Sequence, residues 1–305
     1  MPETKVRRPS TRETMVLGQL PRLSVVAGSI ESDGRSRTYV EVAPEGIADE
    51  SPLVIAFHGS GQTAARFRAF SGYTFDALAA REGIRVVYPD GYRMRWNDVR
   101  ASSNLAAGQK NYDDVAFTRT LIRRFSGRSG SGQVFVVGYS NGGQLVMRLI
   151  QELPELLAGA AIISATQLAP EKAMADDAET PLPVLLVHGT RDRVVPYAGG
   201  TRSVPGFRPR ARELSHAETA RYYAQRNGIT DAPRLSEPNM QPGASTSVET
   251  LDFSQSGKPG VRSVTIVGGG HVVPNPWVAA PRVIGRTHRE LDTGAAMWEF
   301  FSREP

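Results

Sequence analysis

The chain has 305 residues, of which 40% are hydrophobic and none is Cys, and its 36 basic and 31 acidic residues give a formal net charge of +5. A chain of this length can bury a large core, either in one large α/β domain or in two small ones. The lack of Cys excludes disulfide bonds, thiolate nucleophiles, Cys-ligated zinc and iron–sulfur clusters.

Two alternating runs of apolar residues come first, at residues 23–30 and 37–42, and the Asp33-Gly34 pair between them is typical of a β-hairpin turn. Further along, short continuous apolar runs alternate with stretches of helical periodicity. Because these runs contain few polar residues, they predict parallel strands that are covered on both faces. The runs lie at residues 53–57, 84–88, 134–137, 160–163, 184–187 and 264–267.

Helices are predicted between these strands at residues 74–82, 113–125, 142–152 and 215–227, and a last one follows Asp292, a good N-cap. The alternation predicts an α/β fold: an open, mostly parallel central sheet with helices on both faces and an antiparallel hairpin at its N-terminal end. In such sheets ligands bind beyond the carboxyl ends of the strands, so the residues that follow each strand are the candidates for chemistry.

The basic residues are mostly Arg and are spread along the chain, so no nucleic-acid partner is expected. No segment reaches the roughly 18 consecutive apolar residues of a membrane-spanning helix, so no membrane association is expected. Residues 1–20 are charged and lack the apolar core of a signal peptide. We therefore expect a cytoplasmic protein with a loosely ordered segment at residues 1–20 and a single domain over residues 21–305; a leader removed from a longer precursor would make it secreted instead. The oligomeric state is not indicated.

A G-x-S-x-G motif, Gly138-Tyr139-Ser140-Asn141-Gly142, follows one predicted strand and precedes a predicted helix. This is the setting of a nucleophile on a sharp strand-to-helix turn. Side chains at Gly138 and Gly142 would collide with the adjoining strand and helix. The turn presents the Ser140 hydroxyl beside a helix N-terminus, which favours developing negative charge, so Ser140 is the predicted nucleophile.

Asp192 and His271 each follow a later predicted strand. A carboxylate at the position of Asp192 can accept a hydrogen bond from an imidazole and fix its tautomer; the alternative is a turn Asp that bonds its own backbone. His271 comes after three Gly, which let the chain pass close to other loops. The order Ser140, Asp192, His271 is the nucleophile–acid–base order of this architecture.

Four other histidines compete for the role of the base. His58 and His188 belong to His-Gly turns at other strand ends and are expected to support loops, whereas His216 begins a helix and His288 lies in a polar loop. His271 is therefore preferred.

An oxyanion needs two backbone N–H donors. Asn141, the residue after the nucleophile, supplies one in this architecture. The sequence at residues 58–62, His-Gly-Ser-Gly-Gln, is similar to the HGGG-type loop that supplies the other. We assign the second donor to Ser60, with Gly61 as the alternative.

Trp96 and Asn97 are candidates for lining the acyl or alcohol pocket, with a packed loop tryptophan as the alternative reading, and Tyr139 is a third substrate-binding candidate. The pair Asp113-Asp114 is expected to cap the helix that follows it. Residues 199–213 and 231–246, rich in Gly, Pro and Arg, are either a lid or plain surface loops.

With these residues assembled, the sequence resembles the α/β-hydrolases, and more closely the esterase branch with polyhydroxybutyrate depolymerase-like (LpqC-type) and feruloyl esterase-like enzymes. The resemblance spans roughly residues 35–303. The segments that carry it are 58–62, 88–91 (Tyr-Pro-Asp-Gly), 95–98 (Arg-Trp-Asn-Asp), 113–115 (Asp-Asp-Val), 138–143, 188–192 (His-Gly-Thr-Arg-Asp), 195–197 (Val-Pro-Tyr), 269–271 and 298–301.

The resemblance implies a serine carboxylic-ester hydrolase that works through a Ser-His-Asp triad and an acyl-enzyme, without a metal or an organic cofactor. Its partner would be a short-chain, aromatic (feruloyl-type) or hydroxyalkanoate ester. The alternatives are a catalytically silent binding protein of the same fold, or a serine peptidase or acyltransferase with the same triad. Members of the group often follow the base with Thr-Trp-Pro, whereas here Val272-Val273-Pro274 follows it. The lack of Cys and of a leader favours small or intracellular esters.

Overall fold

The computed structural model of the chain describes Gly18 and residues 20–98, 112–126, 133–169, 180–200, 212–239 and 244–304. The expected N-terminal segment, residues 1–20, thus lies outside the described residues apart from Gly18 and Leu20. The strands are β1 (Leu23–Ser32), β2 (Arg35–Pro44), β3 (Leu53–Phe57), β4 (Arg85–Pro89), β5 (Val134–Tyr139), β6 (Gly159–Ile163), β7 (Val184–Gly189), β8 (Arg234–Asn239), β9 (Ser247–Gln255) and β10 (Lys258–Val267). The α-helices are α2 (Ala64–Phe70), α3 (Thr74–Glu82), α5 (Asp114–Phe125), α6 (Asn141–Glu152), α7 (His216–Arg226) and α8 (Thr293–Phe301).

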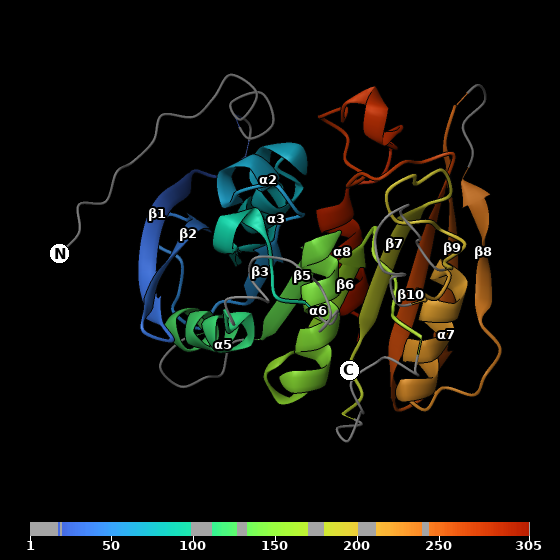
Figure 1. The fold of residues 1–305 in the computed structure, drawn as a ribbon, viewed down its shortest axis with the longest axis horizontal. Helices are drawn as coiled ribbons and strands as arrows, with labels where there is room; N and C mark the ends of the chain where they lie inside the picture. The colour runs from blue at the N-terminus through green and yellow to red at the C-terminus, as the bar shows by residue number, and fades with distance from the viewer. Residues whose placement is uncertain are drawn as a thin grey trace, which may run out of the picture.

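These ten strands form one sheet in the order β1-β2-β4-β3-β5-β6-β7-β10-β9-β8 (Figure 1). The six strands from β4 to β10 in this order are parallel to one another, and the strands at both ends of the sheet pair antiparallel. The predicted hairpin is confirmed: Asp33 and Gly34 form its turn with φ of 51° and 66°, values that Asp and Gly tolerate. The mostly parallel α/β architecture is therefore confirmed.

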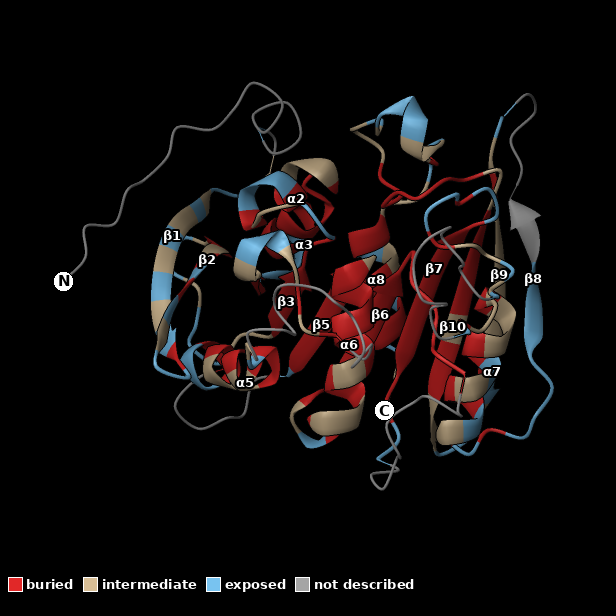
Figure 2. Cartoon of the chain, in the orientation of Figure 1, coloured by how far each residue is buried: buried red, intermediate tan, exposed pale blue. Residues whose placement is uncertain are grey.

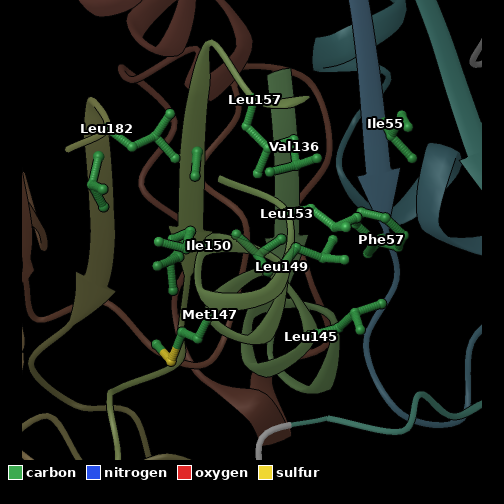
Figure 3. Packing of buried hydrophobic residues seen from close by; sticks show 14 of the residues in the cluster. Ile55, Phe57, Val136, Leu145, Met147, Leu149, Ile150, Leu153, Leu157 and Leu182 are labelled. Atoms are coloured by element: carbon green, nitrogen blue, oxygen red, sulfur yellow. The ribbon is translucent and has the colours of Figure 1, made fainter. Parts of the chain in front are cut away.

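The central strands are buried on both faces, as their continuous apolar character predicts (Figure 2). Along β3, Leu53, Ile55 and Phe57 pack on the face covered by α5, α6 and α7, whereas Val54 and Ala56 pack on the opposite face with α2, α3 and α8. Figure 3 shows the first of these cores, where the apolar residues of α6 lie against β3 and β5. Two cores therefore hold the sheet rigid, and its strand ends provide fixed positions for loops.

Local capping fixes where several helices begin. Asp113 accepts a hydrogen bond from the N–H of Ala116 at the start of α5, and Asp292 does the same for Ala295 at the start of α8, so both predicted caps are confirmed. Asp114 has a different role from the expected capping, because its carboxylate lies 2.7 Å from the guanidinium of Arg37 on β2.

Three elements differ from the prediction. Helix α2 and strands β8 and β9 were not predicted, and β8 falls inside the candidate lid at residues 231–246. Residues 234–239 pair with β9 as an edge strand, so that part is not a loop. Residues 201–211 of the first candidate lid and residues 240–243 of the second lie outside the described residues, so whether either segment forms a lid stays a prediction. Among the helices that the structure describes, none combines the length and the apolar character that a membrane crossing requires.

Candidate active site

Ser140 lies on a strained turn between β5 and α6. Its φ of 55° and ψ of −116° are unfavourable for a residue with a side chain. A Cβ atom at Gly138 would lie 2.2 Å from the carbonyl oxygen of Gly142, and one at Gly142 would lie 2.3 Å from that of Phe57. Only Gly fits at these two positions, which agrees with the sequence argument for a sharp nucleophile turn.

The structure brings Ser140, His271 and Asp192 together from the loops after β5, β10 and β7. The Oγ atom of Ser140 lies 3.0 Å from Nε2 of His271, and Nδ1 of His271 lies 2.7 Å from Oδ2 of Asp192. A carboxylate accepts but does not donate, so Nδ1 of His271 carries a proton. In the neutral imidazole Nε2 is then bare and can accept the proton of the Ser140 hydroxyl.

The carboxylate of Asp192 accepts hydrogen bonds at both oxygens. Oδ1 accepts from the backbone N–H groups of Val194 and Val195, at 2.7 and 2.8 Å, and Oδ2 accepts from His271 and also from His188, whose Nε2 is 3.2 Å away. Burial raises the pKa of Asp192, but the hydrogen bonds from the two histidines outweigh it and hold this pKa well below its ordinary value. Asp192 is therefore ionised at neutral pH.

Close backbone packing holds His271 in place. Its N–H donates to the carbonyl of Ile284 at 2.7 Å, and a Cβ atom at Gly270 would lie 2.4 Å from the Cα of Gly285. The hydroxyl of Tyr139 donates to the carbonyl oxygen of His271 at 2.8 Å. Burial raises the pKa of Tyr139, with the charge of Asp192 adding to the effect, so this hydroxyl keeps its proton. Tyr139 thus supports His271, and its substrate contact stays a prediction.

The backbone N–H groups of Ser60 and Asn141 have no hydrogen-bond partner among the described residues. The neighbouring N–H of Gly61 donates to the carbonyl of Met94 at 2.9 Å, and that of Gly59 donates to Oε1 of Gln62 at 3.0 Å. Of the two residues considered for the second oxyanion donor, Ser60 is therefore the one with a free N–H.

A hydrogen-bond network joins Asn141 to Trp96 and Asp98. Oδ1 of Asn141 accepts from the N–H of Trp96 at 2.8 Å, and Nδ2 of Asn141 donates to Oδ2 of Asp98 at 2.5 Å. The ring N–H of Trp96 donates to the carbonyl of His58 at 2.8 Å, and its side chain is fully buried. Trp96 thus ties two site loops together, as the packed-tryptophan alternative describes; a contact with substrate stays a prediction.

Asn97 is held beside this network. Its N–H donates to Oδ2 of Asp114 at 2.7 Å, and its side-chain amide donates to the carbonyl of Tyr112 at 3.1 Å. The predicted loop role of His58 is confirmed, since Nδ1 bonds the carbonyl of Gly59 and Nε2 accepts from the N–H of Gly91.

Sequence analysis did not predict two of these side-chain contacts, that of Asp98 with Asn141 and that of His188 with Asp192. The spacing places His188 four residues before Asp192 near the same strand end, but it does not determine whether their side chains meet. In the part of the chain that the structure describes, no group of three or more His, Asp or Glu is arranged to hold a metal ion.

The sheet order and the strained serine turn at the end of β5 are those of an α/β-hydrolase. The chain belongs to the phospholipase/carboxylesterase family, whose model matches residues 39–209. Carboxylesterase activity is accordingly its general function.

The chain is similar to proteins from bacteria and fungi. NocK of Nocardia uniformis subsp. tsuyamanensis, an esterase by name, is 30% identical over 280 residues, which are 88% of this chain and 79% of that protein. Feruloyl esterase B of Piromyces equi is 27% identical over 243 residues, 77% of this chain and 42% of that protein. The structure of acetyl xylan esterase from Aspergillus awamori has a TM-score of 0.58 at 19% identity, covering 92% of this chain and 99% of that one, and supports the fold alone.

Proposed function

We propose that the chain hydrolyses carboxylic esters through a covalent acyl-enzyme, with Ser140 as nucleophile, His271 as general base and acid, and Asp192 as the acid that orients the base. The observation that carries this proposal is the pair of hydrogen bonds that joins the three side chains, 3.0 Å from Ser140 to His271 and 2.7 Å from His271 to Asp192. The strained turn at Ser140 supports it, because backbone strain of this kind concentrates at functional sites.

In the first half of the reaction, Nε2 of His271 takes the proton of the Ser140 hydroxyl as the oxygen attacks the ester carbonyl. The resulting imidazolium is stabilised by Asp192, which stays ionised. His271 then gives its proton to the departing alcohol, and the acyl group remains on Ser140. In the second half, His271 activates a water molecule that releases the acid.

The negative oxygen of the tetrahedral intermediate would accept hydrogen bonds from the backbone N–H groups of Ser60 and Asn141. These groups are suited to the role because neither has a partner among the described residues. Asn141 is also the first residue of α6, so the positive end of the helix dipole adds to its donor strength.

For the substrate, we propose a short-chain, feruloyl-type or hydroxyalkanoate ester. The name of one relative, feruloyl esterase B, supports the feruloyl-type ester. The motif residues shared with the polyhydroxybutyrate depolymerase-like branch support the hydroxyalkanoate ester. Turnover of p-nitrophenyl butyrate, feruloyl methyl ester and a hydroxybutyrate dimer under one set of conditions would rank the three.

The hydrolysis of p-nitrophenyl butyrate by the wild type and by Ser140→Ala, with the first turnover resolved, tests the mechanism. We expect a burst of p-nitrophenol close to one equivalent in the wild type and none in the variant. Equal turnover in both proteins would contradict the role of Ser140. No turnover in a folded wild type would contradict a general esterase.

A further inference from the structure

Two buried histidines that the reaction scheme does not use lie behind the triad. His188 is the second-last residue of β7, and His216 begins α7. Their rings meet edge to face, with centroids 5.5 Å apart, and both are almost completely buried. Of these two, His188 contacts Asp192 of the triad, whereas His216 bonds Ser263 and therefore serves as a comparison.

The Nε2 atom of His188 faces two acceptors. Oδ2 of Asp192 lies 3.2 Å away and the carbonyl oxygen of Val195 lies 3.0 Å away. Neither atom can donate, so Nε2 of His188 must carry a proton and donate it to both. Oδ2 of Asp192 is consequently shared between two imidazoles, since it also accepts from Nδ1 of His271 at 2.7 Å.

The other nitrogen of His188, Nδ1, is buried and has no hydrogen-bond partner among the described residues. A second proton on the ring would have no acceptor there, so the geometry is that of a neutral imidazole protonated at Nε2. The groups that face the ring are Asp192 and Val195 of its own loop, the ring of Tyr197, whose hydroxyl pairs with Thr265, and His216 of α7. Burial lowers the pKa of His216 well below its ordinary value, so this neighbour is neutral as well.

We propose that His188 is a positioning residue of the triad, which acts through Asp192. This inference rests on the proposed function of Ser140, His271 and Asp192. The N–H at Nε2 of His188 holds the Asp192 carboxylate in the orientation that the backbone N–H groups of Val194 and Val195 also favour. It also withdraws negative charge from the oxygen that His271 contacts. Asp192 stays correctly oriented, and the imidazolium of His271 is stabilised less strongly than by an unshared carboxylate.

The charge effect separates this role from simple packing. If the N–H of His188 is removed, Oδ2 of Asp192 interacts with His271 alone, and His271 holds its proton more tightly. The acid limb of the activity profile then moves to higher pH. A loss of packing alone would lower activity or stability but would leave the position of this limb unchanged.

The test compares His188→Gln with His188→Asn, because the longer amide can place its N–H where the Nε2 donor lies and the shorter amide cannot reach Asp192. The matched control is His216→Asn, which removes an equally buried imidazole. Nε2 of His216 lies 2.9 Å from Oγ of Ser263, so this nitrogen bonds Ser263 rather than Asp192. The measurement is kcat/KM for p-nitrophenyl butyrate between about pH 5 and pH 9, a range that brackets the imidazole titration.

We expect His188→Asn to lose about 10- to 100-fold in kcat/KM and to move the acid limb upward by about one pH unit, as for a lost hydrogen bond to a charged group. His188→Gln should stay within a few-fold of the wild type with the limb unmoved, and His216→Asn should keep the wild-type limb. An unmoved limb in His188→Asn, or equal behaviour of the Gln and Asn variants, would overturn the proposal. An inactive wild type would overturn the proposed function and this inference with it. An active wild type with an unmoved acid limb in His188→Asn would overturn this inference alone, so the two failures are distinguishable.

A second measurement does not depend on the Asn variant folding. Nitrogen-15 NMR of histidine-labelled wild type, with the His188 signals identified by their loss in His188→Gln, reports which ring nitrogen carries the proton. A proton at Nε2 of His188 in a hydrogen bond supports the proposal. A proton at Nδ1 with a bare Nε2 contradicts it, because a bare nitrogen cannot donate to Asp192.

Discussion

In the proposed triad, Asp192 has the most complete set of hydrogen bonds. Each of its carboxylate oxygens accepts two hydrogen bonds, from the backbone of Val194 and Val195 on one side and from His188 and His271 on the other. Four donors leave this carboxylate with one orientation, and its contact with Nδ1 leaves His271 with one tautomer. The carboxylate of Asp192 is thus fixed in place before substrate binds.

Asp192→Asn should abolish most activity without unfolding the protein. Since the backbone donors of Val194 and Val195 require an oxygen at the Oδ1 position, the amide nitrogen would occupy the Oδ2 position and donate toward His271. His271 would then carry its proton on Nε2 and could not accept one from Ser140. We expect kcat to fall by about 10³- to 10⁴-fold, a loss typical of a triad with the wrong tautomer.

The measurement is kcat for p-nitrophenyl butyrate, with circular dichroism to verify the fold. Asp231→Asn is the control, because Asp231 is exposed and makes none of these contacts. A variant of Asp192 with wild-type kcat would show that the acid is not needed to fix the tautomer.

At the scale of the elements, the loop that carries Trp96 and Asn97 is tied to the start of α5 through Asp114. Asp114 is fully buried and pairs with Arg37 of β2 at 2.7 Å, while its other oxygen accepts from the N–H of Asn97. Burial raises the pKa of Asp114, and the charge of Arg37 opposes that rise. One buried ion pair thus joins a strand, a helix and a site loop.

Arg37→Met should destabilise the protein by about 3–5 kcal/mol, because it leaves a buried carboxylate without its cation. Arg35→Met removes a pair of similar length, 3.0 Å to Asp33, in which both side chains are exposed. We expect that control to cost less than about 1 kcal/mol. Urea unfolding of both variants measures the difference, and equal losses would contradict the assigned role of the buried pair.

Most elements could be predicted because burial on both faces leaves a continuous apolar run in the sequence. Strand β9 (SVETLDFSQ) mixes polar and apolar residues, so its pattern does not separate it from a loop, and α2 has only seven residues. The positions of Ser140, Asp192 and His271 could be predicted because each lies within four residues after the end of a strand. The contact of His188 with Asp192 could not, because it depends on side-chain orientations that spacing does not determine.

At the scale of the whole molecule, the protein buries neutral histidines. Burial lowers the pKa of His58, His216 and His288, most strongly for His216. The unfolded chain therefore binds protons that the folded chain excludes once the pH falls below the ordinary imidazole range. Folding stability must decrease as the pH falls through that range.

We expect the free energy of unfolding to drop between pH 7 and pH 5, with a slope of up to about 1.4 kcal/mol per pH unit for each such histidine. His216→Asn should have a shallower slope than the wild type. Asp192 acts in another window: its pKa is depressed in the folded state, so its contribution is complete above the ordinary carboxyl range and is lost only below about pH 4. Urea unfolding at pH 7, 6 and 5 checks this expectation, and equal slopes in the two proteins would contradict it.

The proposed reaction depends most on one side chain, the Ser140 hydroxyl activated by His271. The most direct test is to treat the wild type with diethyl p-nitrophenyl phosphate and to locate the phosphoryl group by mass spectrometry. We expect one phosphoryl group per chain, carried by the peptide that contains Ser140, and none in Ser140→Ala. Ser164→Ala is the control, because it removes a buried serine with a similar positive φ and should still be labelled. Labelling at another residue, or undiminished labelling in Ser140→Ala, would contradict it.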